Sequence, residues 1–133
     1  MSGKKILIVD DDQHLQLGLT ARLKSNGYRA ISAGDGATAI ALARSESPDL
    51  IILDLGLPAG DGFLFLERVK GLADVGATPV IVLSARDPAG NKKRALDAGA
   101  LAFFQKPPDN YEFLAAIRLA LGETMALSTF LKT

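Results

Sequence analysis

Apolar runs alternate with segments of helical period along most of the chain, a pattern that predicts βα units around a parallel sheet. The helical segment after the first run carries Leu15, Leu19 and Leu23 at spacings of four, which places them on one buried stripe. Five apolar runs predict strands, at about residues 5–10, 28–33, 50–54, 79–84 and 101–105. We therefore expect an α/β fold in which a helix follows each strand.

Aspartates and glycines mark the expected ends of the helices. Aspartate is a preferred N-cap because its carboxylate accepts hydrogen bonds from backbone N–H groups of the first turn. Four aspartates stand at such starts: Asp35, Asp61, Asp87 and Asp109. Gly27 and Gly99 stand where a left-handed residue ends a helix. The helix after Asp61 is expected over about residues 62–71, and Gly90 predicts a weak first turn in the helix after Asp87.

Length and composition narrow the class of protein. The 133 residues, 48% of them hydrophobic, suffice for one domain with its own core. The last helical stripe ends near Leu121, so we expect a domain over residues 1–121 and a tail or linker start over 122–133. The absence of cysteine excludes disulfides and thiolate metal sites.

Charge and hydropathy limit the partners and the location. Fifteen basic residues balance fifteen acidic ones, so no basic footprint indicates direct binding of nucleic acid or of an anionic membrane. The apolar runs are far too short to span a bilayer, and the first residues lack the apolar core of a signal peptide. We expect a cytoplasmic protein.

Chemistry-bearing side chains stand at the ends of four of the predicted strands. Asp10 and Asp11 end the first, Asp54 the third, Ser84 the fourth and Lys106 the fifth. Right-handed crossovers bring the carboxyl ends of parallel strands to one edge, where ligands of such sheets collect. Carboxylates gathered there resist ionisation unless a cation offsets their repulsion. The pattern therefore predicts a metal-assisted phosphate site.

Magnesium suits this set of donors, because Mg²⁺ prefers oxygen ligands and keeps several waters. Asp11 and Asp54 can supply carboxylate oxygens, the backbone carbonyl of Gly56 a third ligand, and Asp10 can hold a metal-bound water. A carboxylate is also a competent nucleophile toward phosphorus. Lys106 would then neutralise a phosphoryl oxygen.

Each of these residues alone has a plainer structural interpretation. A lone acid such as Asp12 after a strand is most often a helix cap, a lone lysine such as Lys106 is most often a surface amine, and Ser84 alone would be a turn hydroxyl. Their occurrence together at successive strand ends favours the site.

Four segments together resemble the response-regulator receiver domain, the phospho-acceptor module of two-component signalling. The segments are KILIVDDD, PDLIILDLGLPAGDG, PVIVLSA and GALAFFQKP. The resemblance covers about residues 4–121. It implies a flavodoxin-like, doubly wound sheet of five parallel strands in the order 2-1-3-4-5, with helices on both faces.

The resemblance also implies a function. Asp54 would accept a phosphoryl group from a sensor histidine kinase or a phosphotransfer protein in a Mg²⁺-dependent reaction. The domain would be a signalling module that catalyses only its own phosphorylation and dephosphorylation and controls a downstream effector. The other site positions that match the family motif are Asp10, Asp11 and the Gly56 carbonyl for the metal, with Ser84 and Lys106 for the phosphoryl group.

Two further sets of residues take roles from the resemblance. Phe103 occupies the position of the switch aromatic, which fills the space vacated when the phosphoryl group draws Ser84 inward, and the Lys106–Pro107 bond is expected to be cis. Kinase docking is expected at the first helix and at the loop after the fifth strand. The positions are His14, Leu15, Gly18, Pro107 and Pro108.

Some positions depart from the family pattern. Leu101 and Ala102 replace an acidic pair that helps to form a charged dimer face, so this face is expected to be apolar. A salt-bridged homodimer is therefore not assumed, and other forms of self-association stay open. Three apolar residues of the tail are candidates for another contact: Met125, Phe130 and Leu131. Gly56 and Arg86 lie at positions that modulate acyl-phosphate lifetime in the family.

Three other functions fit less well. A flavodoxin-like cofactor binder needs a phosphate-cradling loop after the first strand, where the three aspartates would repel a phosphate. A phosphohydrolase of the haloacid-dehalogenase type usually has a second aspartate two residues after the nucleophile, where this chain has Gly56. A scaffold that works without phosphorylation would not need the complete pocket.

Overall fold

The computed structural model describes residues 3–57 and 61–123. Its five strands form one parallel sheet in the order β2-β1-β3-β4-β5, as the resemblance implies. The strands are β1 (Lys5–Val9), β2 (Arg29–Ala33), β3 (Leu50–Leu53), β4 (Val80–Ser84) and β5 (Ala102–Gln105). The helices are α1 (Gln13–Ser25), α2 (Gly36–Glu46), α3 (Asp61–Gly71), α4 (Pro88–Asp97) and α5 (Asn110–Ala120).

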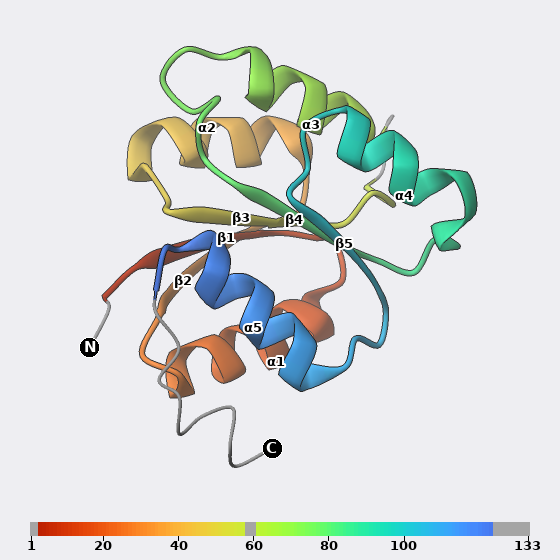
Figure 1. The fold of residues 1–133 in the computed structure, drawn as a ribbon. Coiled ribbons are helices and arrows are strands. Elements are labelled where there is room, and N and C mark those ends of the chain that lie inside the picture. The colour runs from red at the N-terminus through yellow and green to blue at the C-terminus, as the bar shows by residue number, and fades with distance from the viewer. Residues whose placement is uncertain (1–2, 58–60, 124–133) are drawn as a thin grey trace.

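Helices cover both faces of the sheet (Figure 1). The helices α2, α3 and α4 lie on one face and α1 and α5 on the other. The central strands β1, β3 and β4 are apolar on both faces, which is typical of a parallel sheet buried between two helical layers. Each of these strands therefore contributes side chains to two hydrophobic cores, one on each face of the sheet.

Alternate residues of each strand divide between the two cores, because successive side chains of a strand point to opposite faces. Leu7, Ile51 and Val82 pack under α2, α3 and α4. On the opposite face Ile52 and Ile81 pack against α1 and α5. The register sets Val9 beside Leu53, so β1 and β3 end together at the edge predicted to hold the site.

Three of the helices begin at the predicted caps. Asp35, Asp87 and Asp109 each accept a hydrogen bond from a backbone N–H of the first turn. The helix α3 begins at Asp61, one residue before its expected start. Sequence places a helix end only to within a residue or two, because end turns depart from regular geometry.

The helix α4 has the irregular start that Gly90 predicts. Ala89 has ψ 116° and Gly90 has φ 76° and ψ −38°, so neither is helical. A positive φ costs little for glycine because it has no Cβ. Only Ala95 of this helix is buried, so α4 is held to the domain by few apolar contacts.

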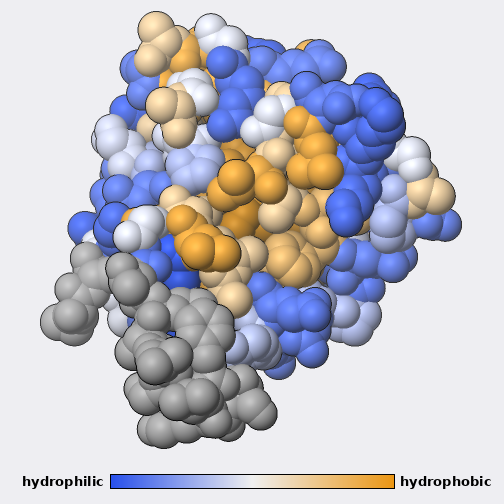
Figure 2. Space-filling view, viewed as in Figure 1, coloured by the Kyte–Doolittle hydropathy of each residue, from blue (hydrophilic) through white to orange (hydrophobic). Residues whose placement is uncertain are grey.

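The face over α4, β5 and α5 is apolar, as the replacement of the acidic pair predicts. Figure 2 shows apolar side chains gathered over β5, between the polar edges of the two helices. Leu96 and Leu101 line a hollow there with residues of β5 and are exposed by 39% and 56%, and Leu119 of α5 is exposed by 71%. The tail residues proposed for a further contact, Met125, Phe130 and Leu131, lie outside the described residues.

The end of α5 is fixed at the amino edge of the sheet, opposite the predicted site. Lys4 Nζ donates to the carbonyl oxygen of Leu121 at 2.8 Å, and the Tyr28 hydroxyl donates to Glu123 Oε1 at 2.6 Å. Burial and the Glu123 carboxylate raise the pKa of Tyr28 to about 12. None of the helices in residues 3–57 and 61–123 is long and apolar enough to cross a bilayer.

Candidate functional site

Three carboxylates meet at the carboxyl edge of the sheet. Asp10 follows β1 and Asp54 follows β3, and a carboxylate oxygen from each lies within 4.8 Å of one from Asp11. Asp10 and Asp54 are buried, whereas Asp11 is exposed. The cluster therefore has an inner wall and one side open to water.

Backbone hydrogen bonds place the two buried acids. The N–H of Asp10 donates to the Ala33 carbonyl at 3.0 Å, and the N–H of Asp54 donates to the Val9 carbonyl at 2.9 Å. These bonds continue the ladders of the sheet one residue past the strands, so both acids share the rigidity of the sheet. Gln16, on α1, also donates its side-chain amide to the carbonyl oxygen of Asp10.

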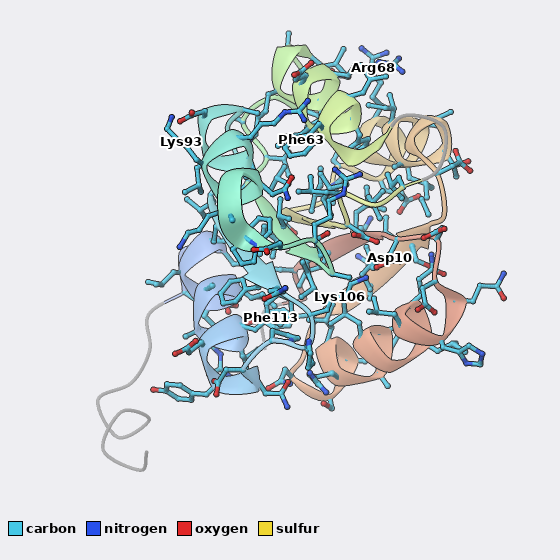
Figure 3. All side chains as sticks on the ribbon, turned by 90° about the vertical axis from the view of Figure 1, so that its right-hand side faces the viewer. Asp10, Phe63, Arg68, Lys93, Lys106 and Phe113 are labelled. Atoms are coloured by element: carbon cyan, nitrogen blue, oxygen red, sulfur yellow. The ribbon has the colours of Figure 1, made fainter. Side chains whose placement is uncertain are left out.

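Lys106 bridges the two buried carboxylates. Its ammonium nitrogen is 2.8 Å from Asp10 Oδ2 and 3.4 Å from Asp54 Oδ2. The backbone N–H of Lys106 donates to the carbonyl of Ser84 at 2.8 Å, so β4 and β5 position the lysine together. The Lys106–Pro107 bond is cis, as expected. Figure 3 shows Lys106 and Asp10 close together at this end of the sheet.

Burial and charge act in opposite directions on the ionisable groups. Burial raises the pKa of Asp10 above its usual value, although the hydrogen bond and charge of Lys106 lower it in part. Partial burial would lower the pKa of Lys106, but the hydrogen bond to Asp10 and the charges of Asp10 and Asp54 raise it overall. The site therefore keeps its lysine charged and makes the ionisation of Asp10 costly.

Asp54 and Ser84 each accept a hydrogen bond from a backbone N–H two residues later. The N–H of Gly56 donates to Asp54 Oδ1 at 3.0 Å. Ser84 is fully buried, and its Oγ accepts a hydrogen bond from the Arg86 N–H at 3.2 Å. A hydroxyl that accepts one bond keeps its own hydrogen for donation, so Ser84 can donate to an anion at the cluster.

The residues of this cluster fit a divalent cation. Three carboxylates face one ammonium, which leaves excess negative charge in a partly buried site. Asp10, Asp11 and Asp54 offer hard oxygen donors, the ligand type that Mg²⁺ takes. Burial disfavours the charged form of Asp10 and so raises its pKa, and a bound cation would offset this unfavourable free energy.

The two aromatic residues of β5 point to opposite cores. Phe103 is 9% exposed and belongs to the core under α2, α3 and α4. Phe104 belongs to the other core and meets Phe113 edge-on, with ring centroids 5.3 Å apart. The expected switch aromatic thus lies inside the domain, three residues before Lys106.

A groove beside the cluster collects most of the residues expected to dock a kinase. It measures about 550 Å³, lies between α1 and the start of α5, and includes Lys106 in its wall. Four expected docking residues line it: Leu15, Gly18, Pro107 and Pro108. His14 does not line the groove, and its side chain is exposed on α1.

Sequence reasoning missed several residues of the groove. Arg22 donates to the Asn110 side chain, which ties α1 to α5 at the rim. Arg22 stands four residues after Gly18, and this helical spacing could have identified it. The remaining residues of the wall carried only the signal of core positions: Leu19, Leu83 and Phe113.

Comparison with known proteins agrees with this geometry. The model of the response regulator receiver domain family matches residues 6–118. The chain belongs to the response regulator receiver domain family. This receiver domain has the strand order that the resemblance implies, and its acidic cluster is formed by aspartates of the segments that carry the resemblance.

Curated relatives of this receiver domain are named transcriptional regulatory proteins or response regulators. It is 40% identical over 121 residues to the transcriptional regulatory protein KdpE of Mycobacterium tuberculosis (strain CDC 1551 / Oshkosh), covering 91% of this chain and 52% of the relative. It is 43% identical over 116 residues to the KDP operon transcriptional regulatory protein KdpE of Escherichia coli (strain K12), covering 87% and 50%. The chain therefore spans about half the length of these relatives.

Solved structures share the fold. A putative response regulator from Chloroflexus aurantiacus has a TM-score of 0.84 at 28% identity and covers 90% of this chain and 98% of its own. The BeF3-activated N-terminal receiver domain of Klebsiella pneumoniae RstA has a TM-score of 0.83 at 28% identity, covering 89% and 98%. Receiver domains are signalling modules, and this chain has their architecture.

Proposed function

We propose that Asp54 accepts a phosphoryl group in a Mg²⁺-dependent reaction and that the modified domain controls an output partner. The main support is the ion-pair geometry, in which Lys106 lies 2.8 Å from Asp10 and 3.4 Å from Asp54, with Asp11 in the same cluster. The donor is a histidine kinase, a phosphotransfer protein or a small acyl phosphate, and the reaction takes place in the cytoplasm.

The transfer makes one bond and breaks one. A carboxylate oxygen of Asp54 attacks phosphorus while the P–N bond of a phosphohistidine breaks, and the electron pair goes to the imidazole nitrogen, which is then protonated. When bound at Asp10, Asp11 and Asp54, with the Gly56 carbonyl as a further ligand, Mg²⁺ supplies charge neutralisation at the phosphoryl oxygens. Lys106 neutralises another oxygen and Ser84 donates its hydroxyl hydrogen to a third.

The response of the domain follows from the same residues. The acyl phosphate draws the Ser84 hydroxyl toward it, and Phe103 repacks in the space that Ser84 leaves. Support for this step comes from the burial of both side chains, at 0% and 9% exposure, on the neighbouring strands β4 and β5. Changes at these strands reach the apolar face over α4, β5 and α5, where an effector binds.

Replacing Asp54 with asparagine tests the acceptor assignment. Incubation with labelled acetyl phosphate and Mg²⁺ is expected to label the wild-type domain and to leave the Asp54→Asn variant unlabelled, because an amide is not a nucleophile toward phosphorus. Asp12→Asn is the matched control, since its side chain caps α1 by accepting from the Leu15 N–H at 3.1 Å and asparagine caps equally well. Equal labelling of wild type and Asp54→Asn would reject the proposal.

The groove beside the cluster is proposed to dock the phosphodonor protein. Gly18 stands in the middle of α1, and a Cβ built there meets nothing within 4 Å, so the free domain does not need a glycine. Glycine inside a helix costs about 0.5–1 kcal/mol relative to alanine. Close approach of a partner across this position is a reason to keep it.

The Gly18→Ala variant separates docking from chemistry. We expect it to raise the free energy of unfolding by about 0.5–1 kcal/mol through helix propensity. We expect it also to slow transfer from the partner kinase while acetyl phosphate labels it at the wild-type rate. Unfolding in urea and the two labelling rates are the measurements. A wild-type rate with the kinase would place docking elsewhere.

A further inference from the structure

The aromatic ring of Phe63, on α3, lies close to two guanidinium groups that have no role in the carboxylate cluster. Phe63 is 2% exposed, and the guanidinium carbon of Arg94, on α4, lies 3.8 Å from the centroid of its ring. The guanidinium carbon of Arg86, from the loop after β4, lies 5.8 Å from the same centroid. Both distances fall within the range of about 6 Å at which an aromatic face attracts a cation. Figure 3 shows Phe63 between α3 and α4.

The contact with Phe63 matters because α4 buries little of its own side-chain surface. Ala95 is the only buried residue of this helix, and its first turn is broken at Ala89 and Gly90. A helix held by few buried contacts moves at little cost. The stack of Arg94 on Phe63 is therefore an important contact in fixing the position of α4 relative to α3.

Phe63 is in turn coupled to the backbone at Asp54. Its neighbour Gly62 donates its N–H to the Leu55 carbonyl at 3.1 Å. A Cβ at Gly62 would lie 2.5 Å from Leu55 Cα and 2.6 Å from the Asp54 carbonyl oxygen, so the two segments are in direct backbone contact. A shift of the Asp54–Leu55 backbone is transmitted to Phe63 without any intervening side chain.

Arg86 reaches the same ring from the other functional strand. Its N–H donates to Ser84 Oγ at 3.2 Å, so a movement of the Ser84 hydroxyl pulls on the backbone of Arg86. Its guanidinium lies 5.8 Å from the centroid of the Phe63 ring, within the range of a cation–π attraction. The ring thus receives a displacement from Asp54 and from Ser84.

We propose that Phe63 is a positioning residue that couples phosphorylation of Asp54 to α4 through its stack with Arg94. This inference rests on the proposed function and adds to it a second route, independent of Phe103. Modification of Asp54 shifts the Gly62–Phe63 backbone, and the movement of the Ser84 hydroxyl shifts Arg86 against the ring. Arg94 follows the ring, and α4 turns about the break at Ala89 and Gly90.

Nuclear magnetic resonance of the domain with and without beryllofluoride and Mg²⁺ tests the route. In the wild type we expect changes at the amides of Asp54, Ser84 and Lys106, at the Arg94 Nε–H, and along α4. In the Arg94→Gln variant we expect the changes along α4 to fall at least twofold while those at the three site amides persist. Lys93→Gln is the matched control, because Lys93 is a neighbouring cation on α4 that pairs with Asp97 at 2.7 Å.

The outcomes distinguish the route from the function on which it rests. The role of the stack would be overturned if the changes at the site amides persist and the changes along α4 are equally large in Arg94→Gln and Lys93→Gln. That result would leave the proposed function intact. No change at the site amides of the wild type would reject both. Phe63→Leu should behave as Arg94→Gln does. If Phe63→Leu does not fold, the comparison of Arg94→Gln with the wild type is sufficient, because Arg94 is exposed and its replacement should not prevent folding.

Discussion

The Lys106→Met variant is expected to accept phosphate from acetyl phosphate at least about 100-fold more slowly than the wild type. The ammonium group lies 2.8 Å from Asp10 and 3.4 Å from Asp54, the proposed acceptor, so it would neutralise the oxygens of the arriving phosphoryl group. Methionine keeps most of the length and the unbranched apolar stem but carries no charge. The rate of labelling at saturating Mg²⁺ is the measurement.

The same variant should be less stable, and increasingly so as the pH rises. Burial holds the pKa of Asp10 above the value near 3.8 of an unfolded chain, so the folded domain binds this proton more tightly. The stability contributed by that proton is complete below the unfolded pKa and is lost as pH rises through the folded pKa. Without Lys106 the folded pKa rises further, because a hydrogen bond and a charge that lower it are gone.

We therefore expect a deficit of roughly 2 kcal/mol at pH 7, below the ~3–5 kcal/mol of a fully buried pair because water reaches one side of the cluster. The deficit should be smaller near pH 4 and should shrink when Mg²⁺ is added. Urea unfolding at both pH values measures it. Lys93→Met serves as the control, since that lysine is 83% exposed and pairs with Asp97 on the surface. A deficit that does not change with pH would contradict the role assigned to Asp10.

The Gly62→Ala variant is expected to lose about 2 kcal/mol of stability and about tenfold or more in the rate of phosphorylation. The added methyl group would lie 2.5 Å from Leu55 Cα and 2.6 Å from the Asp54 carbonyl oxygen. These are backbone atoms, so no side-chain rotation relieves the overlap. The segment that carries the acceptor has to shift, and phosphoryl transfer depends on its placement.

Gly71→Ala is the control for this substitution. Gly71 lies at the other end of α3, and a Cβ there meets nothing within 4 Å. It should therefore be neutral or gain a few tenths of a kcal/mol from helix propensity. If both alanine variants unfold at the same urea concentration, the contact between Gly62 and the acceptor loop has no energetic weight.

Much of the site could be predicted because parallel strands deliver their ends to one edge. The runs that end in Asp10, Asp54 and Ser84 needed only the strand signal and the rule for crossovers. The tertiary contacts of the site were harder to predict from the sequence. Lys106 proved to bridge Asp10 more closely than Asp54, and that difference depends on side-chain geometry which strand order does not specify.

Contacts between helices were the least predictable part. Nothing in the spacing of Phe63, Arg86 and Arg94 indicates that one ring meets both cations, because the three residues belong to separate segments. Gly62 ends a segment that carries the resemblance, but its spacing does not show why a glycine is needed, since that need comes from the Leu55 backbone packed against it. Such requirements arise from tertiary packing alone.

The attachment of α5 through Lys4 and Tyr28 has a practical consequence. It holds Glu123 at the pole of the domain remote from the carboxylate cluster. A biotin or dye joined beyond that residue starts on the far side from Asp54 and from the groove. Immobilisation on a sensor chip through such a label would leave the carboxylate cluster and the groove facing the solution. Binding of candidate phosphodonors could then be measured.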